Sequence, residues 1–115
     1  MPRPLFFEVP TQDAGRAQSF YSTLFGWQFQ KFEGAENYWL ISTGEGPGID
    51  GGMMLRPGPV TNTMDVPSLS AAIQTVQDNG GKVVVEPMTI PGVGNLAYCT
   101  DPDGHIFGII EQASA

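Results

Sequence analysis

Basic residues are scarce in this sequence. Five lysines and arginines stand against twelve aspartates and glutamates in 115 residues, which gives a formal net charge of −7. The five are scattered along the chain, so they do not build the basic patch that binds nucleic acid or an anionic membrane surface. Nucleic acid and membranes are therefore poor partners. The sequence also lacks an apolar run near the ~20 residues that cross a bilayer, and it shows no signal-peptide pattern.

Cysteine and histidine each occur once. Cys99 alone cannot form an intrachain disulfide, and its apolar and aromatic neighbours indicate a packed strand thiol, so we expect a reducing, cytoplasmic compartment. His105 follows a turn signal, where a partly exposed side chain is expected. Because a metal site needs several convergent donors, a single histidine does not favour one.

Turn residues and a repeated order of elements are what the sequence has in abundance. Fifteen glycines and ten prolines predict short strands with tight connections. Each half reads as a strand, a helix and two or three further strands, and the acidic-Val-Pro tripeptide of Glu8 returns at Asp65. We therefore expect an α+β fold of two βαβββ modules, whose curved mixed sheets surround a groove. A single domain spans 1–115, with module one at about 1–56, a hinge at 57–60 and module two at about 61–115.

Two amphipathic helices are expected, one in each half. The first begins after Thr11 or Asp13 and ends at Gly26, and the second begins after Ser68 and ends at Gly80. Apolar residues recur at helical spacing in both, so each helix is expected to bury one stripe. The stripes are Ala17, Phe20, Tyr21, Leu24 and Phe25 in the first helix, and Leu69, Ala72, Ile73 and Val76 in the second.

Alternation along the strands predicts which side chains face the groove. If Phe7 and Val9 pack on the first helix, Phe6 and Glu8 face the groove, and Thr61, Thr63 and Asp65 do so in the other half. On the last strand Gly108 faces it and would leave space for a bulky planar compound. The further candidates for the wall of the groove are aromatic and methionine side chains, each of which could equally belong to the hydrophobic core. These are Tyr38, Trp39, Met53, Met54 and Tyr98, with Trp27 and Met88 beside them.

Glu8 and Asp65 are the candidate catalytic pair. They hold matching places in the two tripeptides, and two carboxylates near apolar surface could act as acid and base, or bind a cationic or hydroxylated ligand. The alternative is structural. In that reading Glu8 lies in water at the mouth of the groove, and Asp65 caps the turn into the second helix.

Two motifs resemble those of the vicinal oxygen chelate superfamily, which includes glyoxalases, extradiol dioxygenases, fosfomycin-modifying enzymes and bleomycin-resistance proteins. The first is Phe20-Tyr21 followed by Phe25-Gly26-Trp27, and the second is Asp101-Pro102-Asp103-Gly104 with the strand up to Gly108. The resemblance covers nearly the whole chain and implies the paired-module fold. Because that fold carries many chemistries, it does not by itself assign an activity.

The resemblance also implies where metal ligands would stand. Metal-dependent members draw two ligands from each half, and the corresponding places here are Gly108, the neighbourhood of Phe6 or Pro4, Thr61 or Thr63, and the stretch from Gly52 to Met54. None offers a good donor. We therefore expect no metal and no cofactor, with an atypical divalent site as the less favoured alternative.

The sequence thus favours a small-molecule-binding protein of the glyoxalase/bleomycin-resistance type, with a planar or apolar ligand. The alternative is a lyase, isomerase or dioxygenase of the same superfamily that uses Glu8 and Asp65 or an atypical metal site. A member that has kept only the fold, in a metabolic or regulatory role, is a third possibility. The resemblance further implies a homodimer.

Overall fold

The computed structural model describes residues 2–33 and 37–113. These residues form two compact units, Leu5–Thr61 and the segment from Asn62 onward together with the first residues of the chain. Each unit contains one helix and four strands in the order β-α-β-β-β, which confirms the predicted α+β fold of two βαβββ modules. No helix in the described part of the chain is long and apolar enough to span a membrane.

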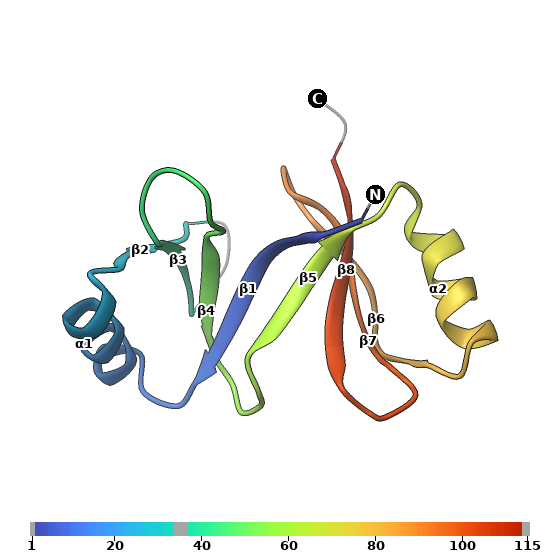
Figure 1. Cartoon of the computed structure of the whole chain (residues 1–115), viewed down its shortest axis with the longest axis horizontal. Helices are drawn as coiled ribbons and strands as arrows, with labels where there is room; N and C mark the ends of the chain where they lie inside the picture. Colours follow the sequence, from blue (N-terminus) through green and yellow to red (C-terminus); the bar gives the residue numbers. More distant parts are fainter. Residues whose placement is uncertain (1, 34–36, 114–115) are drawn as a thin grey trace. The chain divides into compact units, whose positions relative to one another are not determined.

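The first unit carries a mixed four-stranded sheet. Its elements are β1 (Pro4–Thr11), α1 (Ala14–Phe25), β2 (Gln28–Lys31), β3 (Tyr38–Ser42) and β4 (Gly51–Leu55). The strands lie in the order β2-β3-β4-β1, with β1 parallel to β4 and the other pairs antiparallel. The parallel pairing follows from the chain path, because α1 and the hairpin separate β1 from β4 in sequence. The helix lies along one side of this sheet (Figure 1).

The helix α1 begins and ends as its sequence predicts. Asp13 is its N-cap and accepts a hydrogen bond from the Arg16 backbone N–H at 3.0 Å, while Gly26 ends it in the left-handed region at φ 74°. Ala17 and Tyr21 pack on the core of the unit. The rest of the predicted stripe does not, since Phe20, Leu24 and Phe25 are 59%, 58% and 56% exposed. The expectation that α1 buries its whole stripe is therefore wrong, because the small sheet covers only one edge of it.

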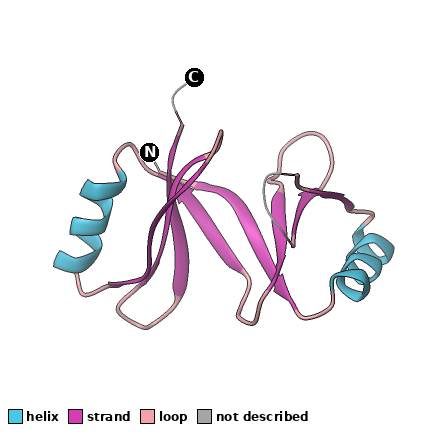
Figure 2. Cartoon of the chain, turned by 180° about the vertical axis from the view of Figure 1, so that it is seen from behind, coloured by secondary structure: helices cyan, strands magenta, loops and turns pink. Residues whose placement is uncertain are grey.

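The second unit repeats this arrangement. It consists of β5 (Thr61–Asp65), α2 (Leu69–Asp78), β6 (Lys82–Ile90), β7 (Gly94–Thr100) and β8 (Ile106–Gln112), in the sheet order β5-β8-β7-β6. β5 and β8 are parallel, and the other pairs are antiparallel. β6 is nine residues long, and its register with β7 shifts twice. Figure 2 shows α2 alongside its own sheet.

The core of the second unit lies between α2 and the sheet. It contains Leu69, Ala97, Cys99 and Ile109, and the predicted stripe of α2 packs on it. Burial raises the pKa of the Cys99 thiol, and the negative charge of Glu86 raises it further. Cys99 is thus the packed strand thiol that the sequence predicts. Ser68 caps α2 through its hydroxyl, which accepts the Ala71 N–H at 3.2 Å.

Candidate functional site

The first unit holds a buried acid on the face of its sheet opposite α1. Glu8 on β1 is 2% exposed, and the Tyr38 hydroxyl on β3 donates a hydrogen bond to its Oε2 at 2.9 Å. The neighbouring Val9 points to the other face, into the core under α1. The expectation that Glu8 could lie in water is therefore wrong. The packing of the apolar core does not require this buried pair of a carboxylate and a phenol.

A glycine makes this contact possible. β4 lies between β1 and β3, and Gly52 is the register partner of both Glu8 and Leu40. The Tyr38 ring lies across Gly52, since a Cβ there would overlap with its hydroxyl and would come within 2.8 Å of its Cε1. Because Gly52 has no side chain, the Tyr38 ring can lie over β4 and its hydroxyl can reach Glu8 on β1.

The second unit has a corresponding face with different chemistry. On the face away from α2, Gly108 of β8 pairs with Thr63 of β5 and with Tyr98 of β7. Thr63 fills the place above Gly108, where a Cβ would overlap with its Oγ1 and lie 3.2 Å from its Cβ. The expectation that Gly108 leaves space for a planar compound is therefore wrong, because the neighbouring threonine takes that space.

Two hydroxyls on β5 are buried and have no hydrogen-bond partner within the described part of the chain. Thr61 and Thr63 are 3% and 0% exposed, and neither Oγ1 has a hydrogen-bond partner among the residues that the structure describes. A buried hydroxyl without a partner costs free energy, on the order of 1–3 kcal/mol. These two threonines therefore carry a cost that an apolar residue of the same shape would avoid.

The strand register changes the predicted match between Glu8 and Asp65. Because Glu8 pairs with Gly52 and Thr63 pairs with Gly108, the residue of the second unit that corresponds to Glu8 is Thr63. Asp65 lies two residues farther along β5, where its Oδ1 accepts the backbone N–H of Arg3 at 3.3 Å. It does not cap α2 either, because Ser68 does. The similar tripeptides thus stand at different places in the two modules.

The other predicted ligand-binding residues divide between the two faces. Met53 is fully buried in the core under α1, and Trp39 and Trp27 pack on the same core. Tryptophan fluorescence would therefore report on the helix side of the sheet. Phe6 and Met54 share the strand parity of Glu8 and Gly52 in the first unit. Thr63 and Tyr98 share the parity of Gly108 in the second unit.

The donors on these faces do not resemble a metal-ligand set. The first unit offers one carboxylate and one phenol, and the second offers a threonine hydroxyl beside a glycine. Divalent ions in proteins are usually held by three or four convergent nitrogen, sulfur or carboxylate donors. In the part of the chain that the structure describes, no three His, Cys, Asp or Glu side chains converge. Neither face by itself therefore fits a divalent ion.

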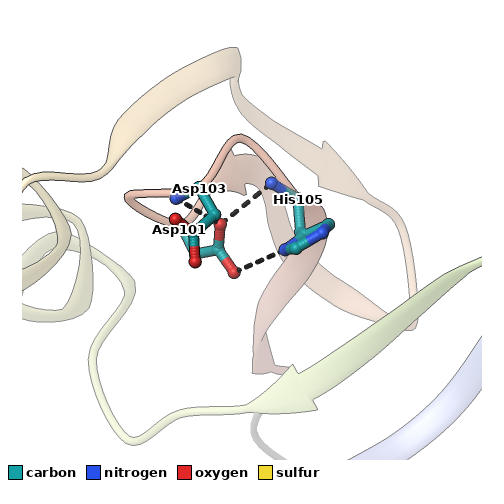
Figure 3. A network of polar contacts seen from close by, with 3 residues as sticks. All are labelled: Asp101, Asp103 and His105. Atoms are coloured by element: carbon teal, nitrogen blue, oxygen red, sulfur yellow. Dashed lines mark hydrogen bonds and ion pairs between the residues drawn. The ribbon is translucent and has the colours of Figure 1, made fainter.

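The single histidine belongs to a turn. The Asp101 Oδ1 accepts the backbone N–H groups of Asp103 and His105, each at 2.9 Å, and its Oδ2 lies 3.2 Å from the His105 Nδ1 (Figure 3). The His105 side chain is 80% exposed. This confirms the expectation of an exposed turn residue. The Asp-Pro-Asp-Gly motif is thus explained by the closure of the β7–β8 connection.

The turn should respond to acid. The hydrogen bond from the His105 backbone N–H is the largest effect and holds the pKa of Asp101 below its ordinary 3.8. Burial opposes it as the second-largest effect, and the His105 ring and the Asp103 N–H lower the pKa further. A lowered pKa in the folded chain means that this stabilisation is complete above 3.8 and is lost as the pH falls through the lower, folded value. A carbon-13 titration should give an Asp101 midpoint below that of the same residue in urea. Equal midpoints would contradict the contact.

Comparison with known proteins supports the resemblance. The family model "Bleomycin resistance protein-like N-terminal" matches residues 3–44. A glyoxylase-like domain-containing protein of Didymella fabae is 30% identical over 112 residues, which cover 89% of this chain and 88% of that protein. CFP32 of Mycobacterium bovis, named as a glyoxylase, and the anthracycline biosynthesis protein DauV of Streptomyces sp. strain C5 are both 27% identical over 92% of this chain. The chain spans only 44% and 46% of the length of these two relatives.

A solved structure shows the same fold over the whole length. A glyoxalase/bleomycin resistance protein/dioxygenase superfamily member from Vibrio splendidus superposes with a TM-score of 0.69 at 17% identity, over 97% of this chain and 100% of that one. The chain therefore belongs to the vicinal oxygen chelate superfamily, the group of glyoxalases, bleomycin resistance proteins and extradiol dioxygenases.

Proposed function

We propose that this chain is a small-molecule-binding protein of the glyoxalase/bleomycin-resistance type, and that it holds its ligand through Glu8 and Tyr38 without the metal ligands usual in the superfamily. The observation that carries this proposal is the buried hydrogen bond from the Tyr38 hydroxyl to the Glu8 carboxylate. A carboxylate removed from water favours a partner that brings a positive charge or a hydroxyl donor. The ligand is thus expected to combine a flat apolar body with one such group.

The comparisons support the planar part of this ligand. The Streptomyces relative is named for the biosynthesis of an anthracycline, and anthracyclines are planar polycyclic compounds. On the Glu8 face, Phe6 and Met54 supply the apolar surface that such a compound needs. We further propose that the protein is cytoplasmic and works as a homodimer, as the superfamily resemblance implies.

An enzyme is the second candidate. Glu8 next to Tyr38 could take up and return a proton, as lyases and isomerases require. In this alternative, Asp65 or an atypical metal site would be a further part of the active site. Turnover distinguishes the two. A binding protein returns its ligand unchanged, whereas a lyase, isomerase or dioxygenase converts it, which mass spectrometry of the recovered compound detects.

The test of the binding proposal uses doxorubicin, a planar anthracycline with one amine, as the probe in calorimetric titrations. Glu8→Gln keeps the shape and removes the charge, so it should weaken binding about 10-fold or more. Tyr38→Phe removes only the hydroxyl that holds the carboxylate, and it should weaken binding by a smaller factor, about 3- to 10-fold. Matched controls are Glu45→Gln in an exposed loop and Tyr21→Phe on the α1 side of the sheet.

The controls decide how the result is interpreted. Both control variants should bind as the wild type does, since Tyr21 packs on the core under α1 and Glu45 lies in an exposed loop outside the strands. Equal affinity of Glu8→Gln and wild type would remove Glu8 from the site. Failure of the wild type to bind doxorubicin would contradict the antibiotic-binding form of the proposal.

A further inference from the structure

The helix α1 leaves an apolar patch uncovered. Phe20, Leu24 and Phe25 are each more than half exposed, and no residue of α1 is fully buried. Phe20 and Leu24 stand one turn apart and line a shallow hollow together with Arg16, Ser19 and Thr23. An exposed cluster of three large apolar side chains on one helix is a typical sign of an interaction surface.

The charge on α1 differs from that of the rest of the protein. The chain has a net charge of −7, yet Arg16 is the one ionisable side chain on the segment Ala14–Phe25 besides Tyr21. Most pairs of faces on two copies of such an acidic protein would repel each other. The segment Ala14–Phe25 has no carboxylate, and the nearest one is that of Asp13 at its N-cap, so self-association through the patch brings few acidic groups together.

The two ends of α1 indicate how a second copy would fit. The Asp13 carboxylate complements the positive N-terminal end of the helix dipole, but the last turn has no basic residue, so the negative C-terminal end has no complement of its own. In an antiparallel pair related by a twofold axis at Phe20, Arg16 of one copy lies beside Leu24 of the other, at the negative C-terminal end of the partner's helix. Each copy thus supplies the positive charge that the other lacks.

We infer that the α1 face, formed by Arg16, Ser19, Phe20, Thr23 and Leu24, pairs with the same face of a second copy of this chain. This inference gives a surface to the homodimer proposed above, and it does not depend on the Glu8 site. Phe20 and Leu24, with Phe25 beside them, expose on the order of 100 Å² each, or about 300 Å² per copy. Stable dimers bury about 600–1,000 Å² per partner, so the pair is expected to be weak.

The experiment uses reciprocal charges at the twofold axis. Sedimentation of the wild type over concentrations from about 5 to about 500 μM should show a reversible dimer. Phe20→Glu and Phe20→Lys each bring two like charges together, so each variant alone should remain a monomer over this range. An equimolar mixture of the two should restore the dimer, because the facing charges are then opposite.

Matched controls keep the test specific. Val60 lies outside α1 and is 57% exposed, so Val60→Glu and Val60→Lys make the same charge changes at equal exposure and should leave the dimer unchanged. Circular dichroism checks that the Phe20 variants stay folded. Arg16→Glu is a second variant, which reverses the charge beside the apolar patch and leaves the apolar side chains in place. A wild type that stays monomeric at every concentration overturns the inference. So does a dimer that persists in both Phe20 variants, while doxorubicin binding by these variants reports separately on the Glu8 site.

Discussion

Replacing Gly52 by alanine is expected to destabilise the chain by displacing Tyr38 from Glu8. The new Cβ would overlap with the Tyr38 hydroxyl and ring, so the tyrosine must leave its place across β4. Glu8 would then lose the hydrogen bond from Tyr38 while it stays buried, at 2% exposure. Losing a hydrogen bond to a buried charged group costs about 1.5–3 kcal/mol, to which the displaced ring adds. Urea unfolding should therefore show a loss of about 2–4 kcal/mol in the free energy of unfolding.

Two further variants separate this mechanism from a general effect of adding a methyl group. Gly15→Ala in the first turn of α1 meets only the Asp13 Oδ1 at 3.7 Å and has no unusual φ, so it should stabilise the chain slightly by helix propensity. The double variant Gly52→Ala with Tyr38→Ala should be no less stable than Tyr38→Ala alone, because the overlap is gone. Additive losses in the double variant would show that Gly52 is required for some other reason.

The pattern of apolar residues predicted the elements of this fold well and the limits of their burial poorly. The stripe of α2 packs on Leu69, Ala97 and Ile109 as predicted. The stripe of α1 has the same spacing, yet Phe20 and Leu24 stay exposed. Periodicity states which side chains share a helix face, but it does not state how wide a sheet lies under that face. The width is a tertiary property, and this is why the exposed patch on α1 could not be predicted.

The Glu8–Tyr38 contact was hidden for a different reason. Strand parity placed Glu8 on the face away from α1, and the register with β4 bears this out. The contact itself needs a residue from β3 to reach over β4, and only the position of Gly52 between them permits that. Pairing of strands distant in sequence is not encoded in local spacing. For the same reason, similar tripeptides suggested a match of Glu8 with Asp65 that the register replaces with Thr63.

Replacing Gly108 by alanine is the second change with a large expected effect on stability. The size of this effect depends on the neighbouring side chain of Thr63, which can itself be replaced. Gly108→Ala places a methyl group against the Thr63 Oγ1, with Thr63 Cγ2 at 3.3 Å, in a strand pair where Thr63 is fully buried. Overpacking of this kind costs about 1–3 kcal/mol. Thr63→Ala removes the crowding Oγ1 and Cγ2 and leaves only the Thr63 Cβ, at 3.2 Å, and it also removes a buried hydroxyl without a partner among the described residues. The double variant should therefore recover most of the loss, with a coupling energy of about 1–2 kcal/mol in a double-mutant cycle.

Thr61 makes this cycle a test of the specific contact. Thr61 lies on the same strand, is 3% exposed and also has a hydroxyl without a partner among residues 2–33 and 37–113. None of its atoms is among the three closest to a Cβ at Gly108. Thr61→Ala should consequently fail to rescue Gly108→Ala, and its effect should simply add. If Gly108→Ala alone unfolds at the wild-type urea concentration, the place above this glycine is open after all. It would then be free for a ligand, as the sequence first suggested.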